Sequence, residues 1–255
     1  MGFVVPAEAY DRFMGRYSVR LSPLLADLAG IEPGEHEMRI IDVGCGPGAL
    51  TAELVERVGS ASVSAVDPSE PFVAAARKRH PAVDVRQASA EELPYATGSF
   101  DAALAQLVVQ FMTDPAAGVG EMKRVTRAGG VVVACVWDHA GGKGPLSPLW
   151  DAARELDPSA TGEAHQIGTR GGDLAALFRS VGLRDVEETA LSVSVEHPTF
   201  DEWWEPFTLG VGPAGVYVAG LDTATRDHLR ERLRAALPAP PFTITASAWA
   251  ARGTV

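Results

Sequence analysis

The sequence has few cysteines, no long apolar run and no excess of positive charge. Its 255 residues include two cysteines, Cys45 and Cys135, and neither belongs to a CxxC pair, so a structural zinc site is not expected. No stretch approaches the roughly 20 apolar residues of a membrane span, and no basic segment followed by an apolar one opens the chain. Two buried thiols suit a reducing compartment. These features predict a soluble cytoplasmic protein without a metal site.

The charge balance is acidic, with a net charge of -11 at pH 7 and an isoelectric point near 5.0. An acidic surface is repelled by phosphate backbones and anionic lipid, which disfavours nucleic acid and membranes as partners. Apolar residues make up 46% of the chain, enough to bury the core of one large domain. The expected partner is therefore a small molecule. The sequence leaves open whether the protein is a monomer or a homodimer.

Apolar strands alternate with amphipathic helices along the chain, which predicts βαβ units and a parallel sheet buried on both faces. We expect strands at 38–43, 62–66, 83–86, 100–107, 131–137, 186–195 and 242–250, and helices at 18–29, 49–58, 71–80, 115–127, 149–156 and 173–181. The fold class is α/β, in one domain over residues 1–255. Residues 140–170 and 197–240 are too long for simple connections and are expected to form a cap over the sheet.

The first expected strand runs into a glycine-rich turn, in the stretch IIDVGCGPGAL from Ile40 to Leu50. Ligands of an open parallel sheet bind beyond the carboxyl ends of its strands, and glycine there permits a positive φ and a close approach to the backbone. The spacing is G-x-G-x-G, whereas the dinucleotide fingerprint is G-x-G-x-x-G. Asp42 precedes the turn and would repel an anion, so a ligand with a cationic group suits it better.

A second acid, Asp67, ends the next expected strand, about 20 residues beyond the glycines. A carboxylate at this place can accept hydrogen bonds from both hydroxyls of a ribose. Together with Asp42, it predicts a nucleoside ligand that has no pyrophosphate and carries a positive charge.

Five segments occur in a characteristic order: IDVGCGPG, AVDPSEPF, QASAEELPYATGSFD, QLVVQF and EMKRVTRAGGVVVACVW. They resemble the motifs of class I S-adenosylmethionine-dependent methyltransferases, in the small-molecule branch called type 11, which includes ubiquinone-biosynthesis enzymes. The resemblance runs from about Tyr10 to Val136 and resumes in LFRSVGLRDVEET and the last strand. It implies a Rossmann-like, mostly parallel seven-stranded sheet whose last strand is antiparallel. It also implies S-adenosyl-L-methionine as cofactor and S-adenosyl-L-homocysteine as product.

The resemblance also assigns cofactor contacts, from the glycine turn under the methionine part to the acid on the ribose and polar groups at the adenine. The residues are Asp42, Gly44, Cys45, Gly46, Gly48, Asp67, Pro68, Ser69, Ser89, Ala90, Glu91, Gln106 and Leu107. Many family members carry Asp where this chain has Ser89, so Glu91 or a backbone carbonyl would contact the adenine amino group. Ser89 is alternatively an ordinary helix N-cap.

The N-terminal segment, residues 1–37, is expected to be helical and to close over the cofactor. Tyr10, Arg16 and Tyr17 would contact the cofactor, and Arg16 would pair with its carboxylate. The alternative is that these three side chains only pack the helix against the sheet.

The sequence gives fewer indications of the residues that bind the methyl acceptor. Gln110 matches a family position that often faces the transferred methyl. Trp137, Asp138 and His139 follow the fifth expected strand at the ligand end, so His139 or Asp138 could act as a general base for a hydroxyl or a carbon acid. A thiol or a carboxylate would need no base. Four aromatic residues could line an acceptor pocket in the cap or simply form its core: Trp203, Trp204, Phe207 and Tyr217.

The predicted function is methyl transfer to a small molecule by in-line displacement, driven mainly by holding the reactants together. An NAD(P)-dependent oxidoreductase on a similar sheet remains an alternative, as does a cofactor- or partner-binding protein without catalysis. The fourth strand is followed by AQLVVQF and not by the NPPY-type tetrad common in enzymes that methylate amino groups of bases.

Overall fold

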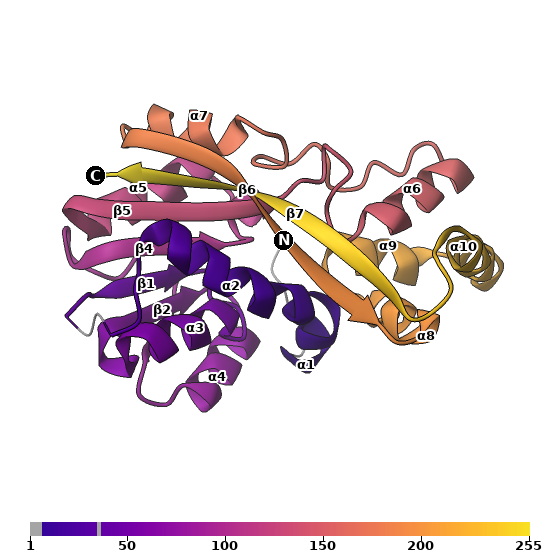
Figure 1. Ribbon diagram of the computed structural model, residues 1–255, viewed down its shortest axis with the longest axis horizontal. Helices are drawn as coiled ribbons and strands as arrows, with labels where there is room; N and C mark the ends of the chain where they lie inside the picture. Colours follow the sequence, from indigo (N-terminus) through magenta and orange to yellow (C-terminus); the bar gives the residue numbers. More distant parts are fainter. Residues whose placement is uncertain (1–6, 35–36) are drawn as a thin grey trace.

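A seven-stranded sheet in the order β3-β2-β1-β4-β5-β7-β6 forms the centre of the molecule (Figure 1). The computed structural model describes residues 7–34 and 37–255, so residues 1–6 and 35–36 of the predicted N-terminal segment lie outside the described residues. The strands are β1 Ile40–Val43, β2 Val63–Asp67, β3 Asp84–Gln87, β4 Phe100–Gln106, β5 Thr126–Trp137, β6 Arg184–His197 and β7 Phe242–Thr254.

Strands β1 to β5 pair in parallel, whereas β7 pairs antiparallel with both β5 and β6. The prediction of a mostly parallel sheet with an antiparallel last strand is thus confirmed. In the register, Ile40 lies opposite Val63 of β2 and Ala102 of β4. The carboxyl ends of β1, β2 and β4 therefore meet at one edge, where a ligand site is expected.

Successive side chains of the central strands enter two separate apolar cores because a strand alternates its faces. Ile40 packs in one core, which α2 (Arg16–Ala29), α3 (Ala49–Val58) and α4 (Glu70–Arg79) cover. Ile41 packs in the other, under α5 (Pro115–Val125) and α7 (Asp173–Ser180). Helices thus cover both faces of the sheet (Figure 1).

The N-terminal segment is helical from Ala7 to Ala29, as expected for this segment, and begins before the helix predicted at 18–29. It comprises α1 (Ala7–Tyr10), a π-helical stretch η1 (Asp11–Gly15) and α2. Two short 3-10 helices, η2 (Ser60–Ser62) and η3 (Val109–Phe111), lie in the connections that precede β2 and α5. The segment α1–η1 contacts the cap and α4, so it lies at the ligand edge of the sheet.

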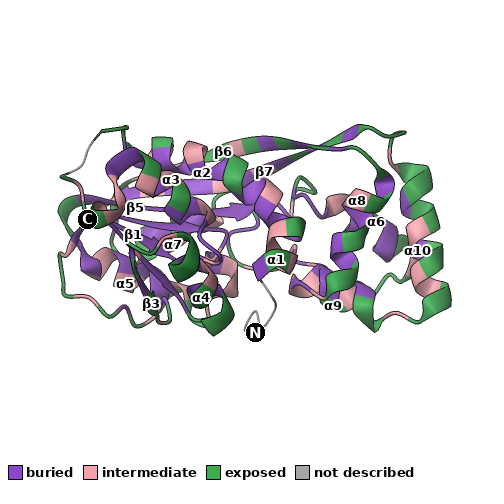
Figure 2. Cartoon of the chain, turned by 90° about the horizontal axis from the view of Figure 1, so that it is seen from below, coloured by how far each residue is buried: buried purple, intermediate pink, exposed green. Residues whose placement is uncertain are grey.

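Strands β6 and β7 are longer than predicted and carry the cap at their far ends. They pair continuously to His197 opposite Phe242, well beyond the other strands (Figure 1). The cap consists of α6 (Ser147–Leu156), α8 (Phe200–Trp204), η4 (Glu205–Leu209), α9 (Gly212–Gly220) and α10 (Thr223–Ala236). Its outermost helix, α10, is largely exposed (Figure 2). Within the described ranges, no helix has the length and apolar character needed to cross a bilayer.

Candidate active site

The glycine turn after β1 is held by packing on one side and open on the other. Gly44, Gly46 and Gly48 have φ values of 72°, 54° and 101°, which L-residues rarely adopt. A Cβ on Gly44 would lie 2.5 Å from Val108, whereas a Cβ on Gly46 would meet nothing within 4 Å. Gly46 therefore leaves room for a ligand to approach the backbone.

A cavity of about 510 Å³ opens beside this turn at the carboxyl ends of the strands. It brings together most of the residues that the sequence assigns to the cofactor. These are Tyr10, Gly44, Gly46, Asp67, Pro68, Ser69, Ser89, Ala90, Glu91, Gln106 and Leu107. Other residues of the lining were not predicted from the sequence: Glu70, Pro71, Phe72, Val108, Phe111, Met112 and Thr113. Most of these lie within or beside the quoted motifs, but apolar side chains carry no chemical signal of their own.

Asp67 both organises the turn and faces the cavity. One carboxylate oxygen accepts the Gly46 N–H at 2.9 Å, and the other accepts the Ser69 N–H at 2.8 Å. A carboxylate offers about four acceptor positions, so two remain for hydroxyl donors of a ligand. Burial raises the pKa of Asp67, while the two backbone N–H donors act in the opposite direction.

The walls of the cavity are acidic. Asp67, Glu70 and Glu91 line it, and no Lys, Arg or His is found among the described residues of its walls. Glu91 is fixed at the rim, where it accepts the N–H of Thr113 at 2.7 Å and the hydroxyl of Ser89. A cavity of this charge favours a cationic ligand and opposes a pyrophosphate.

Gln106 and Leu107 mark the end of β4 in the cavity wall. The Gln106 amide donates to the Ser18 carbonyl at 3.1 Å, but its buried Oε1 has no partner. Leu107 has φ of 61°, an uncommon backbone conformation that concentrates at functional sites. An unpartnered acceptor and a strained residue side by side fit a wall that a bound ligand completes.

Three residues assigned to the cofactor lie behind the turn and outside the cavity lining: Asp42, Cys45 and Gly48. Asp42 is 1% exposed, and burial raises its pKa to about 7. Its Oδ2 accepts the Thr51 hydroxyl at 2.6 Å, and its Oδ1 has no partner. The Cys45 thiol is buried in the apolar core, which raises its pKa.

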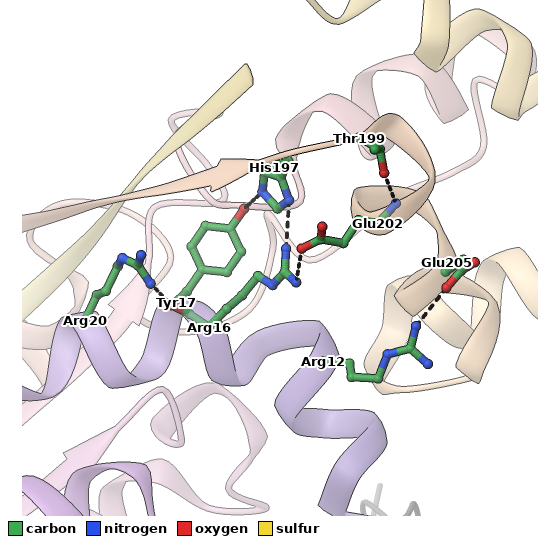
Figure 3. Close-up of polar contacts among 8 residues, drawn as sticks. All are labelled: Arg12, Arg16, Tyr17, Arg20, His197, Thr199, Glu202 and Glu205. Carbon is green, nitrogen blue, oxygen red and sulfur yellow. Dashed lines mark hydrogen bonds and ion pairs between the residues drawn. The ribbon is translucent and has the colours of Figure 1, made fainter. Parts of the chain in front are cut away.

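Arg16 and Tyr17 lie away from the cavity, in a polar network between α2 and the cap (Figure 3). Arg16 donates to His197 Nδ1 at 2.9 Å and pairs with Glu202 at 2.9 Å. Since Nδ1 accepts from Arg16, His197 Nε2 carries the proton and donates to the Tyr17 hydroxyl at 3.1 Å. The Arg16 guanidinium is thus engaged by the cap in this structure, and Tyr10 is the one member of the predicted trio in the cavity wall.

A second, smaller pocket of about 40 Å³ adjoins the cavity and shares Tyr10, Leu107 and Phe111 with it. Gln110, Trp137 and His139, all predicted for the acceptor side, line this pocket. Glu163 lines it too and was not predicted, because it stands in a segment without periodicity.

The two candidate bases differ in position. Asp138 is buried and lines none of the described pockets; its carboxylate accepts the Gly141 N–H at 2.8 Å and so shapes the loop after β5. His139 reaches the small pocket, and burial lowers its pKa to about 4. His139 is therefore neutral at pH 7 and only a weak base.

The cap aromatics pack mostly on one another. Trp203 and Phe207 meet at 4.9 Å between ring centroids, and Trp204 stacks on Phe200. Tyr217 lies against Trp150 at 5.4 Å. In the described part of the chain, Trp203, Trp204, Phe207 and Tyr217 are absent from the walls of both the cavity and the small pocket. The structure thus places Trp203, Trp204 and Phe207 in the core of the cap, with the half-buried Tyr217 packed against it.

A model of the type 11 methyltransferase domain matches residues 41–134, which include the glycine turn, Asp67 and the strained end of β4. The chain belongs to the class I S-adenosylmethionine-dependent methyltransferases. The strand order and the antiparallel β7 agree with this assignment.

Two relatives of this methyltransferase have names that indicate different substrates. It is 32% identical over 162 residues to 2-methyl-6-phytyl-1,4-hydroquinone methyltransferase 2 of Oryza sativa subsp. japonica, covering 62% of this chain and 43% of the relative. It is 31% identical over 151 residues to the malonyl-[acyl-carrier protein] O-methyltransferase of Pectobacterium atrosepticum, covering 59% and 56%. The matches thus span about half the length of these curated relatives.

A solved structure shares the fold at low sequence identity. The geranyl diphosphate C-methyltransferase from Streptomyces coelicolor A3(2), in complex with Mg2+, geranyl diphosphate and S-adenosyl-L-homocysteine, superposes with a TM-score of 0.54 at 15% identity. The match covers 92% of this chain and 78% of that chain.

Proposed function

We propose that this protein transfers the methyl group of S-adenosylmethionine to a small-molecule acceptor. The observation that carries the proposal is the acidic cavity beside the open glycine turn. Its carboxylates attract a sulfonium cation, whereas they repel the pyrophosphate that a dinucleotide oxidoreductase would have to bind. The glycine spacing, one residue tighter than the dinucleotide fingerprint, supports the same choice.

The residues of the cavity fit the cofactor. Asp67 has acceptor positions left for the two ribose hydroxyls, and Gln106 Oε1 offers a free acceptor to an ammonium or hydroxyl donor. Ser89, Ala90 and Glu91 would flank the adenine, and Gly46 provides the open backbone under the methionine part. When bound, the cofactor supplies an activated methyl group on a sulfonium sulfur.

The chain's own contribution is positioning and the exclusion of water. Tyr10, Leu107 and Phe111 line both the cavity and the small pocket, so ligands bound in the two would lie next to each other. Holding two reactants in line can supply roughly 7–11 kcal/mol of the barrier. The two named relatives differ in acceptor, a hydroquinone for one and malonyl-[acyl-carrier protein] for the other, which supports a variable acceptor in this family. The cytoplasmic location stays a prediction.

Calorimetric titration with S-adenosylhomocysteine, with NADH as the control ligand, tests the proposal. We expect micromolar binding of S-adenosylhomocysteine and none of NADH. Tight NADH binding, or no binding of either ligand, would contradict it. Incubation of a cell extract with the protein and methyl-labelled cofactor then separates an enzyme from a non-catalytic binding protein, which should label nothing above background.

A further inference from the structure

The small pocket lies where three parts of the chain meet. Phe13 and Met14 come from the N-terminal segment, Trp137 from the end of β5, and Val211 and Pro213 from the cap. The pocket therefore exists only when the cap and the N-terminal segment are both in place.

Two buried polar atoms in its walls have no partner. Trp137 is 2% exposed, and among the described residues its indole N–H has no acceptor and the Oε1 of Gln110 has no donor. Buried donors and acceptors are nearly always paired in folded proteins. The unused indole donor indicates a ligand group that accepts a hydrogen bond, as a hydroxyl oxygen does, and the unused amide oxygen is open to a second donor of the ligand.

Glu163 adds a carboxyl group to the same walls. It is 4% exposed, and the Trp150 indole N–H donates to its Oε2 at 3.2 Å, which holds the group in place. Burial raises the pKa of Glu163 to about 7, a value suited to accepting a proton near neutral pH. Asp138 does not line this pocket, and burial lowers the pKa of His139 to about 4, so His139 is the weaker base.

The pocket contains no positive charge to balance an anion. Its titratable side chains are Tyr10, His139 and Glu163, and no Lys or Arg belongs to its described lining. A carboxylate or phosphate acceptor would therefore be buried beside Glu163 without a counterion, which is costly. The walls are otherwise apolar and aromatic, so a neutral acceptor with an apolar body fits them.

We propose that this pocket receives the hydroxyl of a neutral phenolic or enolic acceptor and that Glu163 removes its proton during methyl transfer. The inference rests on the proposed function and specifies its acceptor class. The acceptor oxygen forms its bond to the methyl carbon as the S–CH3 bond of the sulfonium donor breaks, and the sulfur keeps that electron pair. The O–H bond breaks in the same step, its electron pair stays on oxygen, and the proton passes to the Glu163 carboxylate.

The size of the pocket shows how an acceptor must enter. A volume of about 40 Å³ holds roughly three water-sized groups, enough for a hydroxyl and its nearest atoms but not for a ring. Two ion pairs join the N-terminal segment to the cap beside it: Arg12 with Glu205 at 2.8 Å and Arg16 with Glu202 at 2.9 Å (Figure 3). Both are at least partly exposed and thus weak, so they oppose only slightly the movement of the two parts that a ring would require.

Three matched probes test the proposal: 4-methylphenol, its methyl ether 4-methylanisole, and 4-methylbenzoate. Each is titrated into protein saturated with S-adenosylhomocysteine. The wild type should bind the phenol at least 10-fold more tightly than the ether or the benzoate. Glu163→Gln and Trp137→Phe should each weaken phenol binding by about 10-fold without changing the affinity for S-adenosylhomocysteine. Glu187→Gln, the same change on the exposed side of β6, is the control and should change neither.

Methyl-labelled cofactor then tests the proton transfer. Wild type should convert 4-methylphenol to 4-methylanisole, and Glu163→Gln should slow the reaction by about 100-fold or more. Equal or tighter binding of the benzoate, no binding of any probe to the saturated protein, or an unchanged Glu163→Gln variant would overturn the proposal. Failure to bind S-adenosylhomocysteine would overturn the proposed function with it, so the two failures are distinguishable.

Discussion

Replacing Gly46 with alanine tests whether a ligand lies against the glycine turn. The added methyl group meets no protein atom within 4 Å, so its effect on folding comes only from φ of 54°. For an L-residue this conformation costs roughly 1–2 kcal/mol. In a chain of this size each kcal/mol lowers Tm by about 2–4 °C. The methyl group would also enter space that the proposed cofactor needs.

Gly30 offers a matched control far from the cavity. It ends α2 with φ of 74°, and a Cβ there also meets nothing within 4 Å. Gly30→Ala and Gly46→Ala should therefore lower Tm by similar amounts. Only Gly46→Ala should weaken the binding of S-adenosylhomocysteine, by at least about 10-fold in affinity or 1.4 kcal/mol in binding free energy. Calorimetry at a temperature well below both melting transitions measures the affinities.

Two outcomes would remove the support for contact between the ligand and the turn. If Gly46→Ala binds S-adenosylhomocysteine as tightly as wild type while its Tm falls, the ligand does not approach the turn. If Gly30→Ala loses the same affinity, the effect is a general loss of stability and says nothing about contact.

Three further changes test the site and its surroundings. Asp67→Asn should lower the affinity for S-adenosylhomocysteine by roughly 10- to 150-fold, the value of charge-assisted hydrogen bonds. An unchanged affinity in calorimetry would show that Asp67 does not bind the ribose. Arg16→Ala should lower Tm but leave that affinity within about twofold, because Arg16 pairs with Glu202; a large loss would restore the predicted pairing with the cofactor carboxylate. Burial lowers the pKa of His197 to about 4, whereas in the unfolded chain it is about 6.5. Its neutral form contributes stability above pH 6.5 that is lost as pH falls toward 4, so urea unfolding across this range should show a smaller loss in His197→Asn, and an identical slope would contradict the assignment.

The sheet and the cofactor cavity were predictable because their signals are local. The glycine turn, Asp67 and the residues after β4 each follow a strand end, and parallel strands bring their carboxyl ends to one edge. Boundaries were less accurate where pairing decides them. Strand β5 begins at Thr126, through Gly129 and Gly130, because Thr126 pairs with Phe100 across an irregular register.

The acceptor side was harder to predict because its contacts join distant parts of the chain. Arg16 pairs with Glu202, which lies 186 residues away in the sequence. No local sequence pattern predicts such a pair. Nothing in the sequence distinguishes Glu163 from exposed acids such as Glu155. Only the fold does so, because it buries Glu163 under Trp150. The aromatic pair Trp203-Trp204 has the composition of a binding surface, but neighbouring aromatic side chains occupy it.

The larger part of the cap, residues 198–241, begins and ends at paired positions, since His197 at the end of β6 lies opposite Phe242 at the start of β7. Residues 198–241 thus connect the two strands of one hairpin. They can change in length or sequence without altering the pairing of any other strand. This arrangement suits a family that uses one cofactor with many acceptors. The segment that contacts the acceptor can change during evolution while the residues of the methyl-donor site stay the same.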